Sequence, residues 1–217
     1  MKRLTLLKYL FAAGAIAALI PSARADFSLN FDTDASGFTG PAVWSAGPAG
    51  WSGGAALKAN FAAPGWNTEF TKNFDWASGE QTDMQQILAT GNGHVSFDVL
   101  IDNSSFTPGV SDWFGIRVAG NSEKGWTQSD LSLTSGGWHN AGDTTLYATH
   151  IDMTFAQLGW VAGTSTWFQI NFGANSGASP CNFYVDNLAV TTVPEPGTFA
   201  LAGLGAAALM IIRRRKA

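Results

Sequence analysis

Nine tryptophan residues are the side chains best able to bind a ligand in this 217-residue sequence, and all lie between Asp26 and Val193. Indole rings either fill a hydrophobic core or offer flat apolar platforms to a ligand. Five of them stand beside Gly, Ser or Asn in turn-like contexts: Trp44, Trp51, Trp66, Trp126 and Trp138. Burial is the commoner outcome for any single tryptophan, but the five together predict at least one exposed platform in a concave or loop-built site.

Catalytic motifs are missing from the same segment. Its three glutamates, Glu69, Glu80 and Glu123, form no Glu-x-Asp-x-x-Glu arrangement, and its three histidines are scattered. The sequence also has no Gly-x-Ser-x-Gly elbow, no His-Glu-x-x-His and no phosphate-binding loop. The pattern favours a protein that is not an enzyme. A polysaccharide hydrolase or lyase stays open, because the many aspartates can supply the two carboxyl groups that glycoside hydrolysis needs.

Charge excludes nucleic acid as a partner. The segment from Asp26 to Val193 carries four basic side chains against 15 acidic ones, a net charge of −11 that repels phosphate backbones. Cations and uncharged polymers remain as partners. Cys181 is the single cysteine, so no intrachain disulfide can form, and stability must come from the core or a bound metal.

Both ends of the chain have the pattern of targeting segments. Residues 1–25 combine a basic start, an apolar stretch and the small-residue site Ala23-Arg24-Ala25, which predicts a signal peptide. Residues 193–217 contain Pro194-Glu195-Pro196, then the 14 apolar residues 199–212, then a cluster of Arg and Lys. A helix of that length covers about 21 Å of a hydrocarbon core of about 30 Å, so it predicts transient membrane anchoring. Permanent anchors at either end are the alternatives.

This order of Pro-Glu-Pro motif, short apolar helix and arginine cluster resembles the PEP-CTERM sorting signal of Gram-negative bacteria. The resemblance implies recognition by exosortase, a membrane transpeptidase that cuts near Pro194, Glu195 and Pro196. It also implies export across the inner membrane and delivery to the outer surface or extracellular matrix. The same tail is catalogued as an ice-binding protein C-terminal domain, but residues 26–192 lack the repeated Thr-x-Thr ladder of a flat ice-binding face.

Period-two alternation of apolar and polar residues recurs between the two ends and predicts β-strands. The segment His94–Asp102 places its apolar residues on one face and leaves the other mostly wet. The last strand, 182–190, is expected to lie beside the N-terminal strand 27–32, and only 81–88 shows a weak helical period. Residues 26–192 are therefore predicted to form an all-β, two-sheet jelly-roll-like sandwich, with a signal helix before it and an apolar helix after it.

Three short segments of the predicted sandwich resemble carbohydrate-binding-module jelly rolls: Leu29-Asn30-Phe31-Asp32, Gly53 to Lys58, and Phe183-Tyr184-Val185-Asp186-Asn187-Leu188. In that superfamily these elements often meet at a structural Ca²⁺. The resemblance implies that Asp32 and Asp186 offer carboxylate oxygens and Lys58 its main-chain carbonyl. The alternative is that Asp186 only shapes a strand bend and Asp32 only caps a turn.

The same resemblance implies sugar binding by aromatic rings that stack on pyranose faces, with Trp44, Trp51, Trp66, Trp126 and Trp138 as the candidates. The leading hypothesis is an exported, non-enzymatic surface or matrix protein that binds exopolysaccharide. A purely structural envelope protein, with its tryptophans in the core, is the alternative from a different class.

Overall fold

The computed structural model describes residues 26–48, 51, 53–61, 66, 68–74, 79–102, 114–133, 139–140, 146–160, 167–176 and 181–192. These residues belong to one compact unit, Ala25–Thr192. The predicted signal helix, the apolar segment 199–212 and Trp138 lie outside the described residues.

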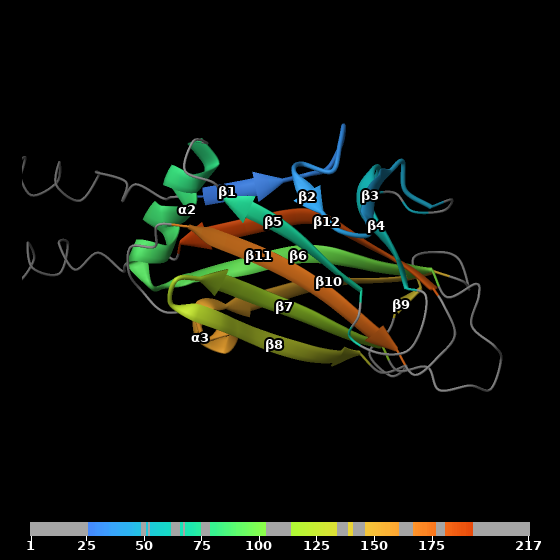
Figure 1. The fold of residues 1–217 in the computed structure, drawn as a ribbon. Helices are drawn as coiled ribbons and strands as arrows, with labels where there is room; N and C mark the ends of the chain where they lie inside the picture. Colours follow the sequence, from blue (N-terminus) through green and yellow to red (C-terminus); the bar gives the residue numbers. More distant parts are fainter. Residues whose placement is uncertain are drawn as a thin grey trace, which may run out of the picture. The chain divides into compact units, whose positions relative to one another are not determined.

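Two antiparallel sheets form a sandwich, which confirms the predicted fold class (Figure 1). The seven-stranded sheet has the order β3 (Ala42–Ser45), β4 (Ala56–Phe61), β12 (Cys181–Thr192), β6 (Gly93–Asp102), β10 (Leu146–Thr154) and β9 (His139–Asn140), with β1 (Asp26–Leu29) also paired to β12. The five-stranded sheet has the order β2 (Phe38–Thr39), β5 (Thr68–Phe74), β11 (Phe168–Ser176), β7 (Phe114–Ser122) and β8 (Gly125–Leu133).

Two helices lie at the same end of the sandwich (Figure 1). The weak helical period corresponds to α2 (Gly79–Thr90), and α3 (Phe155–Leu158) is a single turn after β10. Thr154 begins α3 with a capping box, in which its side chain accepts from the Gln157 amide, and Gly159 ends it in the left-handed conformation.

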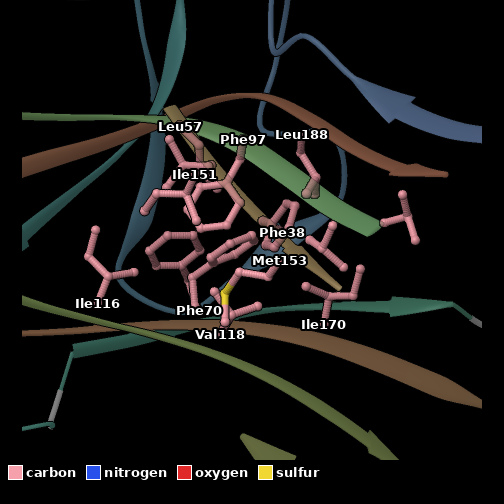
Figure 2. Packing of buried hydrophobic residues seen from close by; sticks show 14 of the residues in the cluster. Phe38, Leu57, Phe70, Phe97, Ile116, Val118, Ile151, Met153, Ile170 and Leu188 are labelled. Carbon is pink, nitrogen blue, oxygen red and sulfur yellow. The ribbon is translucent and has the colours of Figure 1, made fainter. Parts of the chain in front are cut away.

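Aromatic rings hold the two sheets together. Phe97 of β6 meets Phe172 of β11 with ring centroids 4.9 Å apart, and Phe70 of β5 meets Phe183 of β12 at 5.4 Å. Figure 2 shows Phe70 and Phe97 among the aliphatic side chains that fill the space between the sheets. The core follows from the alternation in the sequence, because every second residue of these strands faces inward.

The first and last strands pair as predicted, from Asp26 opposite Thr191 to Leu29 opposite Leu188. The first strand is shorter than predicted, because Phe31 has a φ of +50° that a strand cannot continue through. In β12 a bulge between Asp186 and Ala189, with Asn187 at φ +50°, changes the register. Both Val185 and Leu188 can therefore face the core.

The outer face of β6 is less exposed to solvent than its alternation of apolar and polar residues predicts. Leu100 is buried there in a second small cluster with Ala56 and Tyr184, and Trp51 packs against that cluster. A covering loop residue supplies this burial, and a strand pattern carries no information about such a contact.

Candidate functional site

The outward side of the five-stranded sheet carries an organised set of polar and aromatic side chains. Because Phe168, Ile170 and Phe172 of β11 face the core, Gln169, Asn171 and Gly173 face outward. The strand register brings residues of four strands to the same surface. We call this surface the polar face; it consists of Glu69, Thr71 and Asn73 of β5, Gln169, Asn171 and Gly173 of β11, Gly115, Arg117, Ala119 and Asn121 of β7, and Trp126, Gln128 and Asp130 of β8.

One row of the polar face is a chain of hydrogen-bonded amides that crosses the strands. Asn121 Nδ2 donates to Gln169 Oε1 at 2.9 Å, and Gln169 Nε2 donates to Asn73 Oδ1 at 2.6 Å. The row ends at Trp126, which lies opposite Asn121 and donates from Nε1 to Gln128 Oε1 at 2.8 Å. Three spacings of about 4.8 Å make the row about 14 Å long.

Arg117 is the charged centre of the polar face. Its Nε and Nη2 donate to the two carboxylate oxygens of Asp130 at 2.8 and 3.3 Å, and its Nη1 donates to Glu69 at 3.3 Å. Gly173 lies between Arg117 and Glu69 in the register, so no side chain of β11 blocks the contact. Hydrogen bonding to Asp130 is the main reason that the pKa of Arg117 is raised.

Two of the predicted tryptophans belong to this surface. The Trp66 ring lies 4.3 Å from the Arg117 guanidinium carbon and covers Gly115, where a Cβ would come within 3.1 Å of the ring. Trp126 stands on the sheet edge and is 43% exposed. One ring is therefore held by a cation beneath it, whereas the other offers open apolar surface.

The middle of the polar face holds an unsatisfied donor. Asn171 is buried and accepts a hydrogen bond from the Thr71 hydroxyl through its side-chain oxygen. Its Nδ2 has no hydrogen-bond partner among the residues that the structure describes. The neighbouring position on β7 is Ala119, which is also completely buried.

The other predicted tryptophans are not brought together with this pair. Trp44 is also 43% exposed but lies on β3 of the opposite sheet, and its Nε1 donates to the Phe31 carbonyl at 2.8 Å. Trp51 is half-buried against Tyr184. The expectation that the exposed rings sit in turns is wrong for Trp44 and Trp126, because both lie within strands at a sheet edge, where pairing is one-sided.

The predicted metal ligands Asp32 and Asp186 lie in one electrostatic cluster with Asp98, which we call the acidic corner. Asp186 is only 1% exposed, and its Oδ1 accepts from the Asn187 amide at 2.7 Å. Burial, followed by the charges of Asp98 and Asp32, raises the pKa of Asp186 to about 6. Asp98 accepts from Asn187 Nδ2 at 2.8 Å and lies 2.6 Å from His150 Nδ1.

The chemistry of the acidic corner suits a hard cation, since Ca²⁺ prefers oxygen ligands and a buried carboxylate gains from a positive charge. Asp32 and Asp186 are the residues that would hold it. Lys58 lies opposite Tyr184 of β12 and Val43 of β3 in the strand register. Main-chain carbonyls at such positions form hydrogen bonds with the neighbouring strands. Across the described residues, no group of three or more His, Cys, Asp or Glu side chains is placed to hold a metal.

Sequence reasoning missed most of the polar face. The signal was present in the non-core positions of the alternating strands, where amides and small residues recur, as in Gln169-x-Asn171-x-Gly173. Their meeting with Arg117 and Trp66 depends on the order of strands in the sheet, which a single sequence does not reveal.

Comparison with solved structures finds the same β-sandwich fold in other proteins. A carbohydrate-binding module specific for non-crystalline cellulose shares the fold, with a TM-score of 0.50 and 15% identity over 70% of this chain and 85% of that one. The cleaved adhesin domain of Lys-gingipain from Porphyromonas gingivalis has a TM-score of 0.48, 12% identity and coverage of 77% and 98%. A module from Caldicellulosiruptor saccharolyticus, solved with mannohexaose, has a TM-score of 0.46, 16% identity and coverage of 78% and 97%.

Residues 192–216 match the model of the PEP-CTERM protein-sorting motif. The motif indicates an exported protein that an exosortase handles at the membrane. No curated protein matches the chain. The helices within the described residues are all too short or too polar to cross a membrane, and the apolar part of the motif lies outside those residues.

Proposed function

We propose that this protein is an exported, non-enzymatic glycan-binding protein that holds extracellular polysaccharide on its polar face. The observation that carries the proposal is the juxtaposition of Trp66 and Trp126 with a hydrogen-bonded array of amides and carboxylates on one sheet. A pyranose ring has an apolar face and a rim of hydroxyl groups. Aromatic rings match the face, and amide and carboxylate side chains match the rim. The fold shared with a cellulose-specific module is consistent with this function.

Binding rather than catalysis accounts for the charged residues of the polar face. Glu69 and Asp130 are its two carboxylates, and Arg117 bridges them. A glycosidase needs one carboxyl group free to donate a proton and another free to act as nucleophile or base. Two carboxylates tied to one guanidinium serve better as fixed acceptors for sugar hydroxyls.

Sorting through the C-terminal motif would place the protein at the outer surface. In this proposal exosortase cuts near Pro194-Glu195-Pro196, after transient anchoring through the apolar segment that follows. The product then reaches the outer surface or matrix of a Gram-negative bacterium, where exopolysaccharide is the available ligand. A structural Ca²⁺ held by Asp32 and Asp186 is part of the proposal and would offset the repulsion within the acidic corner.

The test compares Trp126→Ala with Trp44→Ala, since the two rings are equally exposed but lie on different sheets. The full-length protein, in a detergent without a sugar headgroup, is titrated with cellohexaose, mannohexaose and laminarihexaose while tryptophan fluorescence is followed. We expect saturable binding that Trp126→Ala weakens about tenfold and that Trp44→Ala leaves unchanged. Absence of binding to soluble glycans and to isolated exopolysaccharide would favour the purely structural alternative.

A further inference from the structure

The charge arrangement around Arg117 restricts the kind of glycan that the polar face can take. Resting on the proposed function, we propose that this face selects uncharged glycans and rejects those that carry carboxylate or sulfate groups. The argument concerns the three groups at its centre, the Arg117 guanidinium and the carboxylates of Glu69 and Asp130.

Arg117 is not available to an anionic ligand. Each of its three guanidinium nitrogens already donates to one of the two carboxylates, and the Trp66 ring covers its face at 4.3 Å. Only 15% of the side chain is exposed. A ligand carboxylate would have to displace Asp130 from a two-bond pairing, which is the strongest geometry available to an arginine.

The two carboxylates remain open to a ligand. The side chains of Glu69 and Asp130 are 37% and 39% exposed. Two negative charges against one positive charge leave this centre with a net charge of −1. Carboxylate oxygens accept hydrogen bonds from sugar hydroxyls but repel uronate or sulfate groups at the same distance.

Among the described residues, no other Lys or Arg compensates the charge of this centre. Lys72 points to the core side of β5, where it binds the Ser36 carbonyl and Glu80. Lys58 lies on the opposite sheet over Tyr184, and Lys124 stands at the β7–β8 turn beside Glu123. The parts of residues 26–192 that the structure does not describe contain no Lys or Arg in their sequence, so they add only negative charge.

The experiment uses matched ligands and matched variants of the full-length protein. Cellohexaose, mannohexaose and laminarihexaose are each compared with their C6-oxidised uronate counterparts. The variant Glu69→Gln with Asp130→Asn removes two negative charges from the polar face and keeps side-chain oxygens that accept from Arg117. The control Asp83→Asn with Asp152→Asn removes the same charge from α2 and β10.

We expect the unmodified protein to bind a neutral oligosaccharide more tightly than its uronate. The ratio of neutral to uronate affinity should be about three- to tenfold smaller in the double variant Glu69→Gln with Asp130→Asn. This is the size of a like-charge repulsion at a partly solvated surface. The control leaves the ratio within about twofold, because Asp83 lies on α2 and Asp152 on the opposite sheet. Dissolved ions screen charges that are farther apart than the Debye length of about 8 Å. Thermal unfolding of each variant verifies that it is folded.

A second measurement needs no variant. Raising the salt concentration of the unmodified protein from about 0.01 M to 1 M shortens the screening length from about 30 to 3 Å, so uronate affinity should rise relative to neutral affinity. Equal binding of neutral and uronate ligands would overturn the inference, as would equal shifts in the two double variants. Either result would contradict the selectivity but not the proposed glycan binding. If no ligand binds at all, both the proposed function and the selectivity are wrong.

Discussion

Asp186 shows how one buried side chain can couple stability to pH. Its folded-state pKa of about 6 exceeds the ordinary value of 3.8, so the folded protein binds a proton more tightly than the unfolded chain. The ionised carboxylate therefore lowers the free energy of unfolding. This destabilisation of the folded state is absent below about pH 4 and fully present above about pH 6. The free energy of unfolding therefore decreases as pH rises through that window.

We predict that Asp186→Asn stabilises the protein at pH 7.5 in EDTA by up to about 3 kcal/mol, because each pKa unit corresponds to about 1.4 kcal/mol. The difference should disappear near pH 3.5. If Ca²⁺ binds the acidic corner, adding it raises the melting temperature of the unmodified protein but not of the variant. Calorimetry over pH and Ca²⁺ concentration measures both effects. A variant less stable than the parent in EDTA at pH 7.5 would contradict the argument.

Single residues also mark the limit of sequence prediction at the site. The tryptophan count and the neighbours of each ring identify candidates, and Trp66 and Trp126 are among them. The sequence does not indicate that Trp66 rests on Arg117 while the equally plausible Trp51 packs on Tyr184. Each outcome depends on a contact between segments distant in sequence, and local patterns carry no information about that partner.

At the scale of strands and helices, prediction works where one face is core. The alternation in β6 is reproduced by burial as far as Val99, because the core requires every second side chain to be apolar. In β11 residues 170–174 are all buried, so burial does not alternate there. Short strands such as β2 and β9 have two residues each, too few to show a period. Trp44 and Trp126 occupy strands despite neighbouring Ser or Gly, since pairing with a neighbouring strand overrides local preference.

The junction between α3 and the five-stranded sheet gives a prediction at this scale. A Cβ on Gly120 would lie 2.5 Å from Trp160 Nε1 and 3.0 Å from Phe168 Cζ. The Trp160 N–H is buried and has no partner within the described part of the chain. Gly120→Ala should therefore destabilise the protein by about 1–3 kcal/mol through overpacking, measured by urea denaturation.

A double-mutant cycle verifies the cause of that loss. Trp160→Phe removes the indole nitrogen and the second ring, so the added methyl group has space. The Gly120→Ala penalty should be clearly smaller in the Trp160→Phe background. An unchanged penalty would show that main-chain effects, rather than the contact with Trp160, set the cost.

For the whole molecule, the best-defined sequence signal is the C-terminal sorting motif. The PEP-CTERM motif was recognisable in the sequence because its three parts follow one another locally, and the family match covers it. The polar face was not recognisable in the sequence, because it is assembled from four strands spread over residues 69–173.

We predict that replacing Pro194, Glu195 and Pro196 by alanine keeps the protein with the inner membrane and out of the outer-surface fraction. Fractionation and immunoblotting of a Gram-negative host with an exosortase measures the distribution. Thr198→Ala serves as the control within the same tail. The sorting proposal fails if the alanine variant and the parent distribute alike, or if the parent distributes identically in a host without the exosortase.

The central position of β12 has a consequence for when the chain can fold. β12 pairs with β6 along one edge and with β4 and β1 along the other, so it is the strand that joins both halves of its sheet. It is also the last of the described strands to leave the ribosome. A nascent chain that has not yet reached residue 192 cannot close the sheet, and such distant pairings are slow to form. The seven-stranded sheet therefore stays open until the C-terminal strand has been made, so its closure is a late event in the synthesis of the chain.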